Sequence, residues 1–312
     1  MNITVLGAGA MGSLFGGYLS RHNEVWLVDV DAQRVNTINK KGVTITENNG
    51  EALYKPNAVI NTTGLDEMDL ILVFVKAMFT IEAVGQNRHL IGKDTYVMTL
   101  QNGAGHESKL LQFADVDHIL IGTTQHNSSI ISDGHIHHGG GGKTTIGILG
   151  GNSDRVQYIA DSFSDCGIKT VVSNKVKEQI WRKLFLNTAA SSLTAILQVP
   201  LGFILDDPYA CSIMERLAQE AVVVANAEGF TQFDVEKVIS DIKGVLANAR
   251  GGYTSIYADL KNGVRTEVDT ISGTIVKTAG RLGVPVPYHE LVVSLIHAFE
   301  DKGQYIKSNK KG

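Results

Sequence analysis

The feature that most constrains the fold is a glycine-rich segment close to the N-terminus. Its residues are Gly7, Ala8, Gly9, Ala10, Met11 and Gly12, and they join an apolar run, Ile3–Leu6, to a helical stretch, Ser13–Ser20. In a strand–turn–helix unit with this spacing, the first glycine permits the tight turn, the second lets the backbone approach a pyrophosphate, and the third allows close helix–strand packing. The helix N-terminus adds unpaired N–H groups that favour a phosphate. The segment therefore predicts a dinucleotide-binding unit, with a ligand-free tight turn as the structural alternative.

An acidic residue stands where such a unit holds the adenosine ribose. A second apolar run, Glu24–Val28, ends at Asp29, which lies 22 residues after Gly7. A carboxylate there binds the ribose hydroxyls and repels a 2′-phosphate. Neither of the next two residues is basic, although Arg34 is close. We therefore expect NAD(H) as the preferred cofactor and NADP(H) as the alternative. A solvated loop acid is the other interpretation of Asp29.

The character of the sequence changes near residue 173. Before it, short β-rich runs alternate with helical stretches, which indicates a parallel sheet covered on both faces, and the runs after Thr123 predict antiparallel hairpins that extend this sheet. Beyond it, the segments of helical length and spacing are Lys175–Leu197, Tyr209–Gly229, Phe233–Asn248, Glu267–Leu282 and His289–Glu300. We predict an α/β Rossmann-type N-terminal domain with extra antiparallel strands (residues 1–173), followed by an all-α C-terminal domain (residues 174–312).

Composition excludes several classes of protein. A chain of 312 residues with 43% hydrophobic residues can bury a core, which argues against intrinsic disorder. A net charge of −4 without a basic block argues against nucleic-acid and anionic membrane partners. No apolar run approaches the roughly 18 residues that span a bilayer. The N-terminus enters the first strand at once, which leaves no room for a signal peptide, and Cys166 and Cys211 fit a reducing compartment. We expect a soluble, cytoplasmic protein.

The helix predicted over Lys175–Leu197 carries a narrow polar stripe. At about 100° per residue its members fall within roughly 80° of one another. They are Lys183, Asn187, Ser191 and Thr194, on a segment that is otherwise largely apolar. A helix that is apolar on most sides is buried, so its polar stripe must be hydrogen-bonded or face a polar cavity. An ordinary solvated face is the alternative.

A buried lysine beside a nicotinamide has a specific chemical use. Hydride transfer to a ketone carbon puts negative charge on the carbonyl oxygen, and an ammonium group can supply both a positive charge and a proton. Desolvation lowers the pKa of a lysine toward the working pH. We therefore predict Lys183 as the general acid. A carboxylate would hold its charge and orientation, and Glu267, near the start of the helix predicted over Glu267–Leu282, is the leading candidate.

Two polar residues follow predicted parallel strands. Lys76 ends the run Leu70–Val75 and Asn102 follows Thr99-Leu100, at the strand edge where open α/β sheets bind ligands. Ordinary polar loop residues are the alternative. A histidine cluster lies elsewhere in this half, at His126, His135, His137 and His138. His135 and His137 share one face of a predicted strand, but no third ligand stands at a suitable spacing beside them. We therefore predict no metal site.

Together these segments resemble the ketopantoate reductase family over nearly the whole chain. Besides the glycine segment, the motifs that carry the resemblance are Phe74-Val-Lys-Ala77, Gln101-Asn-Gly103, Trp181-Arg-Lys-Leu-Phe-Leu-Asn187, Ser255 through Thr266-Glu267-Val268-Asp269, and Gly283-Val-Pro-Val-Pro287. The resemblance implies an active site in the cleft between the two domains, with Lys183 as general acid and Glu267 as its partner. It places Asn187 and Ser255 on the substrate, and Lys76 and Asn102 near the nicotinamide–ribose end of the cofactor and the substrate carboxylate. By analogy, the resemblance leaves open whether the chain forms a homodimer through its helical half.

The chain departs from the family at positions that set cofactor and substrate choice. NADPH-using members resemble one another in an arginine at the position of Val30, which here is flanked by acids. The family's second helix asparagine is Ser191, which we keep as a substrate-binding residue, and two further substrate asparagines match Leu201 and Gly252. Lost polar partners weaken the case for a hydroxyl-bearing substrate such as ketopantoate. The pattern is closer to the family's NAD-dependent D-2-hydroxyacid (D-mandelate-type) dehydrogenases, which take bulky or C3-branched 2-oxo acids.

The sequence thus predicts an NAD(H)-dependent oxidoreductase that interconverts bulky or C3-branched 2-oxo acids and D-2-hydroxy acids. Within the family, the alternative is a 2-dehydropantoate 2-reductase that makes pantoate for pantothenate and coenzyme A. The β-hydroxyacid dehydrogenases share a lysine and an asparagine four apart on a helix, but they lack the Thr-Glu and Val-Pro-Val-Pro motifs. A non-catalytic nicotinamide sensor would have lost the acid, whereas Lys183 and Glu267 are both present.

Overall fold

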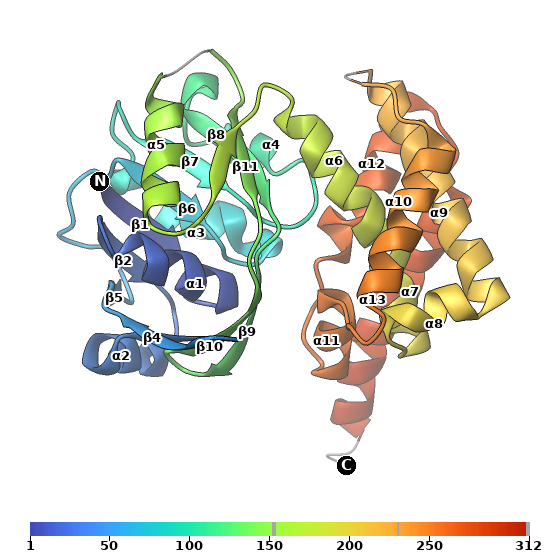
Figure 1. Cartoon of the computed structure of the whole chain (residues 1–312), viewed down its shortest axis with the longest axis horizontal. Coiled ribbons are helices and arrows are strands. Elements are labelled where there is room, and N and C mark those ends of the chain that lie inside the picture. Colours follow the sequence, from blue (N-terminus) through green and yellow to red (C-terminus); the bar gives the residue numbers. More distant parts are fainter. Residues whose placement is uncertain (152–153, 230, 310–312) are drawn as a thin grey trace. The chain divides into compact units, whose positions relative to one another are not determined.

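The computed structural model describes residues 1–151, 154–229 and 231–309. The chain divides into two compact units. The first contains Met1–Gln101 and His106–Gln179, and the second contains Asn102–Gly105 together with the chain from Ile180 onward. The short segment Asn102–Gly105 therefore belongs with residues that come much later in the sequence. Figure 1 labels the elements of both units.

The first unit contains an eight-stranded sheet in the order β12-β11-β8-β7-β6-β1-β2-β5. Its strands are β1 (Asn2–Leu6), β2 (Glu24–Val28), β5 (Asn57–Val59), β6 (Leu70–Val73), β7 (Tyr96–Thr99), β8 (Ile119–Thr124), β11 (Thr144–Ile148) and β12 (Thr170–Val172). All neighbouring strands are parallel except β8 and β11. Every residue of β6 and β7 is buried, which explains their continuous apolar sequences. The predicted Rossmann-type sheet is confirmed.

The helices of this unit are α1 (Ala10–Leu19), α2 (Ala32–Lys41), α3 (Thr80–Gln86), α4 (Glu107–Leu110) and α5 (Asp154–Asp165). Figure 1 shows α1 and α5 in front of the large sheet. Helix α1 packs on β2 and also on β3, β9 and β10 of a second sheet, so it lies between two sheets. Every residue from Gly12 to Leu19 is buried, which is why this stretch has no polar face.

The second sheet corrects one sequence prediction. It has the order β4-β3-β10-β9 and contains β3 (Val43–Glu47), β4 (Gly50–Tyr54), β9 (Asn127–Ser132) and β10 (His135–Gly140). The hairpin of β9 and β10 is antiparallel as predicted, but it does not extend the large sheet, because β10 pairs with β3 instead. Only β11 adds an antiparallel strand there, next to β8. Periodicity predicts strands but not their partners, and β3, β4 and β5 were not predicted.

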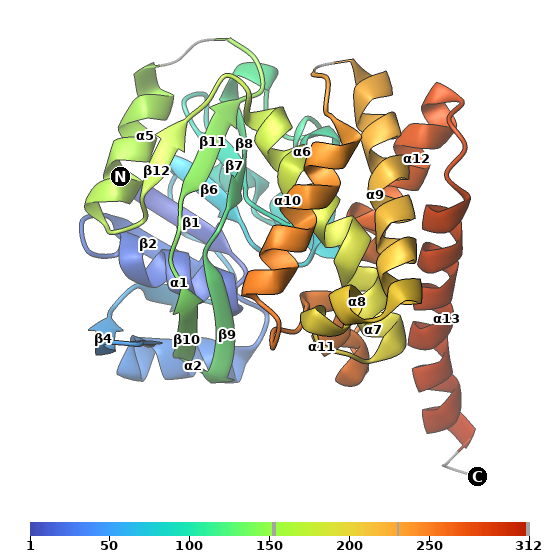
Figure 2. The ribbon, with the colours of Figure 1, turned by 45° about the vertical axis from the view of Figure 1, so that its right-hand side comes forward.

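The second unit is helical, as predicted. Its helices are α6 (Val176–Leu186), whose first turn lies in the first unit, α7 (Ser192–Leu197), α8 (Leu201–Asp206), α9 (Pro208–Glu228), α10 (Val235–Asn248), α11 (Ser255–Lys261), α12 (Ser272–Leu282) and α13 (Pro287–Asn309). Helix α9 packs against α8, α10, α12 and α13, and Figure 2 shows it running between α10 and α13. Asp207 caps its N-terminus by accepting the N–H groups of Tyr209 and Ala210. No helix within the described residues is long and apolar enough to cross a membrane.

Two predicted helices differ from the structure. The helix predicted over Lys175–Leu197 is interrupted by a π-helical segment, Asn187–Ser191, which we call the π-turn. The helix predicted to begin at Glu267 begins at Ser272, because Val268–Thr270 forms a 3-10 turn and Ile271 has non-helical backbone angles of φ −99° and ψ −91°. Hydroxyl contacts between distant segments lie next to both differences and are described below. Helices α8 and α11 were not predicted.

Candidate functional site

The glycine segment forms the turn between β1 and α1. Gly7 has a φ of +98°, and its N–H donates to the Val28 carbonyl at 2.8 Å. A Cβ at Gly7 would lie 2.9 Å from the backbone nitrogen of Val75, and one at Gly12 would lie 1.8 Å from the Gly7 carbonyl oxygen. The fold itself therefore requires both glycines.

Gly9 is different, because a Cβ there would have no heavy atom within 4 Å. Nothing in the protein requires a glycine at this position, which directly precedes α1. Open space beside a helix N-terminus is what a bound pyrophosphate needs. The loop thus fits a dinucleotide. Its other residues take structural contacts: the Ala10 carbonyl accepts from Ser128 at 3.2 Å, and Met11 packs against the core.

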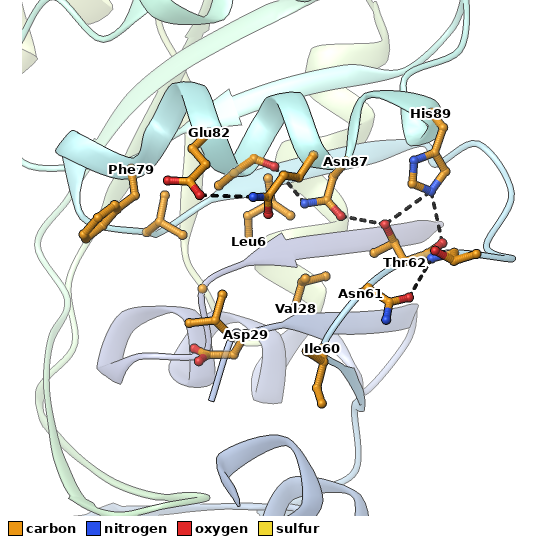
Figure 3. A pocket seen from close by; sticks show the side chains of 16 residues that line it. Leu6, Val28, Asp29, Ile60, Asn61, Thr62, Phe79, Glu82, Asn87 and His89 are labelled. Atoms are coloured by element: carbon orange, nitrogen blue, oxygen red, sulfur yellow. Dashed lines mark hydrogen bonds between the residues drawn. The ribbon is translucent and has the colours of Figure 1, made fainter. Parts of the chain in front are cut away.

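A pocket of about 360 Å³ adjoins this loop, and Figure 3 shows its lining. It lies at the carboxyl ends of β1, β2 and β6, where β1 has β2 on one side and β6 on the other. This is the point at which the strand order reverses, and open α/β sheets bind their ligands there. Its apolar lining includes Val28, Ile60 and Phe79. The volume lies within the range of small-molecule sites.

The polar wall of this pocket is held by its own hydrogen bonds. Thr62 donates to Asn87 Oδ1 at 2.6 Å, and Asn87 Nδ2 donates to the Ala83 carbonyl at 2.7 Å. His89 Nε2 lies 3.0 Å from the Thr62 carbonyl oxygen. Figure 3 shows these side chains converging at one end of the pocket. No sequence pattern predicts these residues, because Thr62 and Asn87 come from connecting segments without a recognised motif.

Asp29 lines the same pocket, and its carboxylate is already engaged by the protein. Oδ2 accepts the Ala8 N–H at 2.8 Å, and Oδ1 accepts the Asp31 N–H at 3.0 Å. Arg34 Nη1 lies 3.1 Å from both oxygens. Asp29 therefore fixes the glycine segment to the end of β2, in addition to any contact with a ribose.

The surroundings of Arg34 are strongly acidic. Its guanidinium pairs with Asp29, with Asp31 at 3.6 Å and with Asp133 at 3.4 Å. Burial lowers the pKa of Arg34, but the three carboxylates outweigh it and raise the pKa, so the residue stays charged. Three carboxylates around one guanidinium leave an excess of negative charge. Val30, beside them, is 89% exposed.

Lys183, on α6 in the second unit, is partly buried. Desolvation lowers the pKa of its ammonium group to about 8, and the opposite charge of Glu267 acts against this fall. The two side chains therefore interact electrostatically. A pKa near 8 allows the group to give or accept a proton close to neutral pH.

Asn102 is joined to Glu267 through one threonine. The Thr270 hydroxyl lies 3.3 Å from the Asn102 carbonyl oxygen and 3.2 Å from the Glu267 carbonyl oxygen. The Ala104 N–H donates to the Thr270 carbonyl at 3.1 Å. Gly103 permits this approach, since a Cβ there would lie 2.0 Å from the Thr270 carbonyl oxygen. The structure therefore brings Asn102, Glu267 and Lys183 into one neighbourhood of the second unit.

The π-turn carries Asn187 and Ser191 and is tied to the start of α11. Asn187 is its first residue and is partly buried, whereas Ser191 is its last and is 5% exposed. The Ser191 carbonyl accepts from Thr194 at 3.0 Å and from Thr254 at 3.4 Å. Thr254 caps α11 and so places the exposed Ser255 beside this segment. Thr194 therefore makes a structural hydrogen bond and is not part of an open polar stripe.

The two positions where the sequence departs from the family asparagines are neighbours. The Leu201 N–H donates to the Gly252 carbonyl at 3.0 Å, and a Cβ at Gly252 would lie 3.3 Å from Leu201 Cδ1. Next to them, the rings of Tyr253 and Tyr257 lie 4.4 Å apart. Tyr253 is 56% exposed, so it is not a core residue.

Lys76 and the histidine cluster remain in the first unit. Lys76 follows β6 and precedes a 3-10 turn, Ala77–Phe79, at the carboxyl edge of the sheet.

His126 Nδ1 lies 2.9 Å from His138 Nε2, and His138 Nδ1 lies 2.7 Å from Glu47. Within the described part of the chain, no group of three or more His, Cys, Asp and Glu residues could hold a metal ion.

Comparison with known proteins follows the same division of the chain. The family model described as "Ketopantoate reductase PanE/ApbA" matches residues 3–151, and the one described as "Ketopantoate reductase PanE/ApbA C terminal" matches residues 175–300. The 2-dehydropantoate 2-reductase of Halobacterium salinarum is 30% identical over 307 residues, which cover 97% of this chain and all of that protein. The one of Streptococcus pyogenes serotype M6 is 29% identical over 303 residues, which cover 96% and 98%.

Solved structures agree with these matches. The ternary structure of D-mandelate dehydrogenase with NADH and anilino(oxo)acetate has a TM-score of 0.91 and 32% identity, over 97% of this chain and 99% of that one. The PanE/ApbA family ketopantoate reductase from Ralstonia eutropha JMP134 has a TM-score of 0.90 and 28% identity, over 97% and 100%. The chain is an oxidoreductase-type protein with a nicotinamide-binding fold, and it belongs to the ketopantoate reductase family.

Proposed function

We propose that this protein is an NAD(H)-dependent oxidoreductase that interconverts bulky or C3-branched 2-oxo acids and D-2-hydroxy acids. The observation that carries the proposal is the Lys183 ammonium, with its pKa lowered to about 8 by burial and coupled to Glu267. Such a group donates a proton to a carbonyl oxygen that gains negative charge, and it takes the proton back in the reverse direction. Glu267 keeps the amine protonated over a wider pH range than burial alone would allow.

The residues that would hold the cofactor are in the first unit. The segment Gly7–Gly12 would accept the pyrophosphate over Gly9, and the pocket of Figure 3 would accept the adenosine end beside Asp29. When bound, the nicotinamide supplies or accepts the hydride. Lys76 and Asn102 would bind near its ribose and the substrate carboxylate, and the reaction requires Lys183 to meet the same substrate.

The acidic surroundings of Arg34 support NAD(H). A 2′-phosphate would enter a region where Asp29, Asp31 and Asp133 outnumber one guanidinium. Val30 supplies no compensating charge. The structural relative D-mandelate dehydrogenase was solved with NADH. NADP(H) is the alternative, and it would require Arg34 to leave its carboxylates.

The substrate proposal rests on the neighbouring Leu201 and Gly252. The resemblance places asparagine at both of these adjacent positions in ketopantoate reductases. This chain has a leucine at the first and a glycine at the second. This removes hydrogen-bond partners for a hydroxyl group and makes the two positions apolar, which favours an apolar substituent. The exposed Tyr253 beside them can contact an aromatic or branched group. Asn187, Ser191 and Ser255 would bind the polar end of the substrate.

A 2-dehydropantoate 2-reductase is the second candidate, because the curated relatives described above carry that name. One experiment separates the two. Purified protein is assayed with NADH and with NADPH against benzoylformate, 2-oxoisocaproate and ketopantoate. We expect the highest kcat/KM with NADH and one of the first two acids. A preference for ketopantoate with NADPH would refute the first proposal and support the second.

A further inference from the structure

A row of buried polar side chains passes through the second unit beside the π-turn. His289 on α13 has its Nδ1 2.7 Å from Glu220 Oε2 and its Nε2 2.9 Å from Thr188 Oγ1. Thr188 Oγ1 lies 3.0 Å from Ser272 Oγ, which lies 3.2 Å from Ser192 Oγ. Thr188, Ser192, Ser272 and His289 are each fully buried. We call these five residues the Glu220–Ser192 relay.

Glu220 anchors one end of this relay. Its carboxylate also accepts the N–H groups of Tyr288 and His289, each at 3.0 Å. Burial alone would raise the pKa of the Glu220 carboxyl, but these hydrogen bonds lower it below its usual value. An ionised carboxylate only accepts, so His289 Nδ1 carries the proton that it donates to Glu220, and the other ring nitrogen, Nε2, faces the Thr188 hydroxyl.

Two hydroxyl groups of the relay lie at the two ends of the π-turn. Thr188 is the second residue of the π-turn and Ser192 is the first residue of α7, and both contact Ser272 on α12. A π-helical segment has wider hydrogen bonding than an α-helix, is rare, and needs support from its surroundings. The neighbouring core is apolar and includes Phe185, Ala189 and Leu217. Apolar side chains would fill this space without desolvating polar groups, so the polar relay specifies conformation rather than adding stability.

We propose that Glu220 and His289 are positioning residues, which act through Thr188 and Ser272 to hold the π-turn in the register that directs Asn187 toward the 2-oxo acid. The inference rests on the proposed function, since it takes Asn187 as a substrate ligand. Neither positioning residue touches the substrate. Their effect reaches it through the backbone that joins Thr188 to Asn187, four residues after Lys183.

The first test removes one hydroxyl from the relay and restores it. Thr188→Val keeps the shape of the side chain but removes the hydroxyl that contacts His289 Nε2 and Ser272, so Ser272 keeps only its contact with Ser192. We expect kcat/KM for the 2-oxo acid to fall by roughly 10- to 100-fold, as a small displacement of a substrate ligand does, mainly through KM. Thr188→Ser should restore it to within about threefold. The Kd for NADH should not change in either variant, because its candidate site lies in the first unit.

Further variants separate positioning from stability. His289→Gln can still reach Thr188 but loses the hydrogen bond to Glu220, and His289→Asn keeps the bond to Glu220 but loses the one to Thr188, so both variants should show the same rise in KM. Ile242→Val on α10 is the matched control: it trims a buried side chain outside the relay and should leave kcat/KM unchanged. An equal fall of kcat/KM in Ile242→Val, or wild-type kinetics in Thr188→Val, would overturn the proposal.

A measurement without substrate keeps this inference distinct from the proposed function. Amide hydrogen exchange of residues 187–192 should be faster in Thr188→Val than in Ile242→Val at matched stability of unfolding. If wild-type protein reduces no 2-oxo acid, the proposed function fails while exchange still decides whether the relay holds the π-turn. Equal exchange in the two variants would show that it does not.

Discussion

The two units build their candidate sites in different ways. In the first, the segment Gly7–Gly12 and Asp29 stand at the ends of adjacent strands, with Leu6 paired to Val28 in register. In the second, Lys183, Glu267 and Asn102 come from three distant segments, joined by the electrostatic coupling of the first two and the hydroxyl group of Thr270. A site built from backbone turns restricts residue identity locally. A site assembled from distant side chains restricts residue identity only through the contacts that those side chains make with one another. The two sites should therefore respond differently to mutation.

The largest effect should come from the second site. Lys183→Ala removes the proposed general acid, and we expect kcat for the 2-oxo acid to fall by roughly 10²-fold or more. The Kd for NADH, measured by fluorescence titration, should stay within about twofold, because the glycine segment is intact. Lys183→Arg keeps the positive charge but cannot release a proton near neutral pH, so it should not rescue turnover.

Lys177→Ala is the matched control, since Lys177 is an exposed lysine on the same helix, α6. Its kinetics should equal those of the wild type. Near-normal turnover in Lys183→Ala would remove the assignment of this residue as the acid, and with it the proposal that chemistry resides in the second unit.

The first site should separate binding from folding within one turn of chain. Gly9→Val adds a side chain where the protein has open space, at extended backbone angles that valine accepts. We expect it to fold normally and to weaken NADH binding about tenfold or more, a loss of about 1.4 kcal/mol. Gly12→Ala places a Cβ 1.8 Å from the Gly7 carbonyl oxygen and should instead lower the free energy of unfolding.

Titration calorimetry and urea unfolding of both variants test this contrast. Wild-type NADH affinity in Gly9→Val would place the pyrophosphate elsewhere. Normal stability in Gly12→Ala would mean that the turn relaxes, and the difference between the two glycines would disappear.

The same difference explains what the sequence could predict. The glycine segment, the strands β1, β2, β6 and β7, and the position of Asp29 follow from spacing and apolar runs, because each depends on neighbours in the chain. Lys183 was predicted from a helical stripe, and Glu267 from the resemblance and from the need for a carboxylate. These predictions concern residue type and local geometry.

The rest depends on contacts that periodicity does not contain. The π-turn changes the helical register after Leu186, and its Thr188 contacts Ser272 and His289, which are far away in the sequence. The second sheet depends on the pairing of β3 with β10. Asp29 was predicted as a ribose ligand, but its hydrogen bond to the Ala8 N–H was not, because a carboxylate in a sequence does not show which donors the fold brings to it.

A smaller effect concerns the coupling of Lys183 to Glu267. The reduction needs the ammonium form, so its kcat/KM should fall as the pH rises through about 8, and the oxidation should show the opposite dependence. Glu267→Gln removes the charge that raises the pKa of Lys183, so both limbs should move to lower pH by on the order of one unit. pH profiles of both directions measure this shift. An unmoved limb, or one that moves to higher pH, would contradict the coupling.

The smallest effect should be on the choice of cofactor, because two acids would remain around Arg34 in one variant and the added cation of the other would be screened by solvent. Asp29→Ala would not separate the effect of the lost charge from a change in structure, because it also removes the acceptor for the Ala8 N–H. Asp29→Asn keeps an acceptor oxygen and removes the charge, and Val30→Arg adds a cation at a position that is 89% exposed. Each should raise the ratio of kcat/KM with NADPH to that with NADH by about fivefold, which corresponds to roughly 1 kcal/mol. If neither variant changes the ratio, the acidic group around Arg34 does not select the cofactor, and discrimination must reside in the pocket wall formed by Thr62 and Asn87.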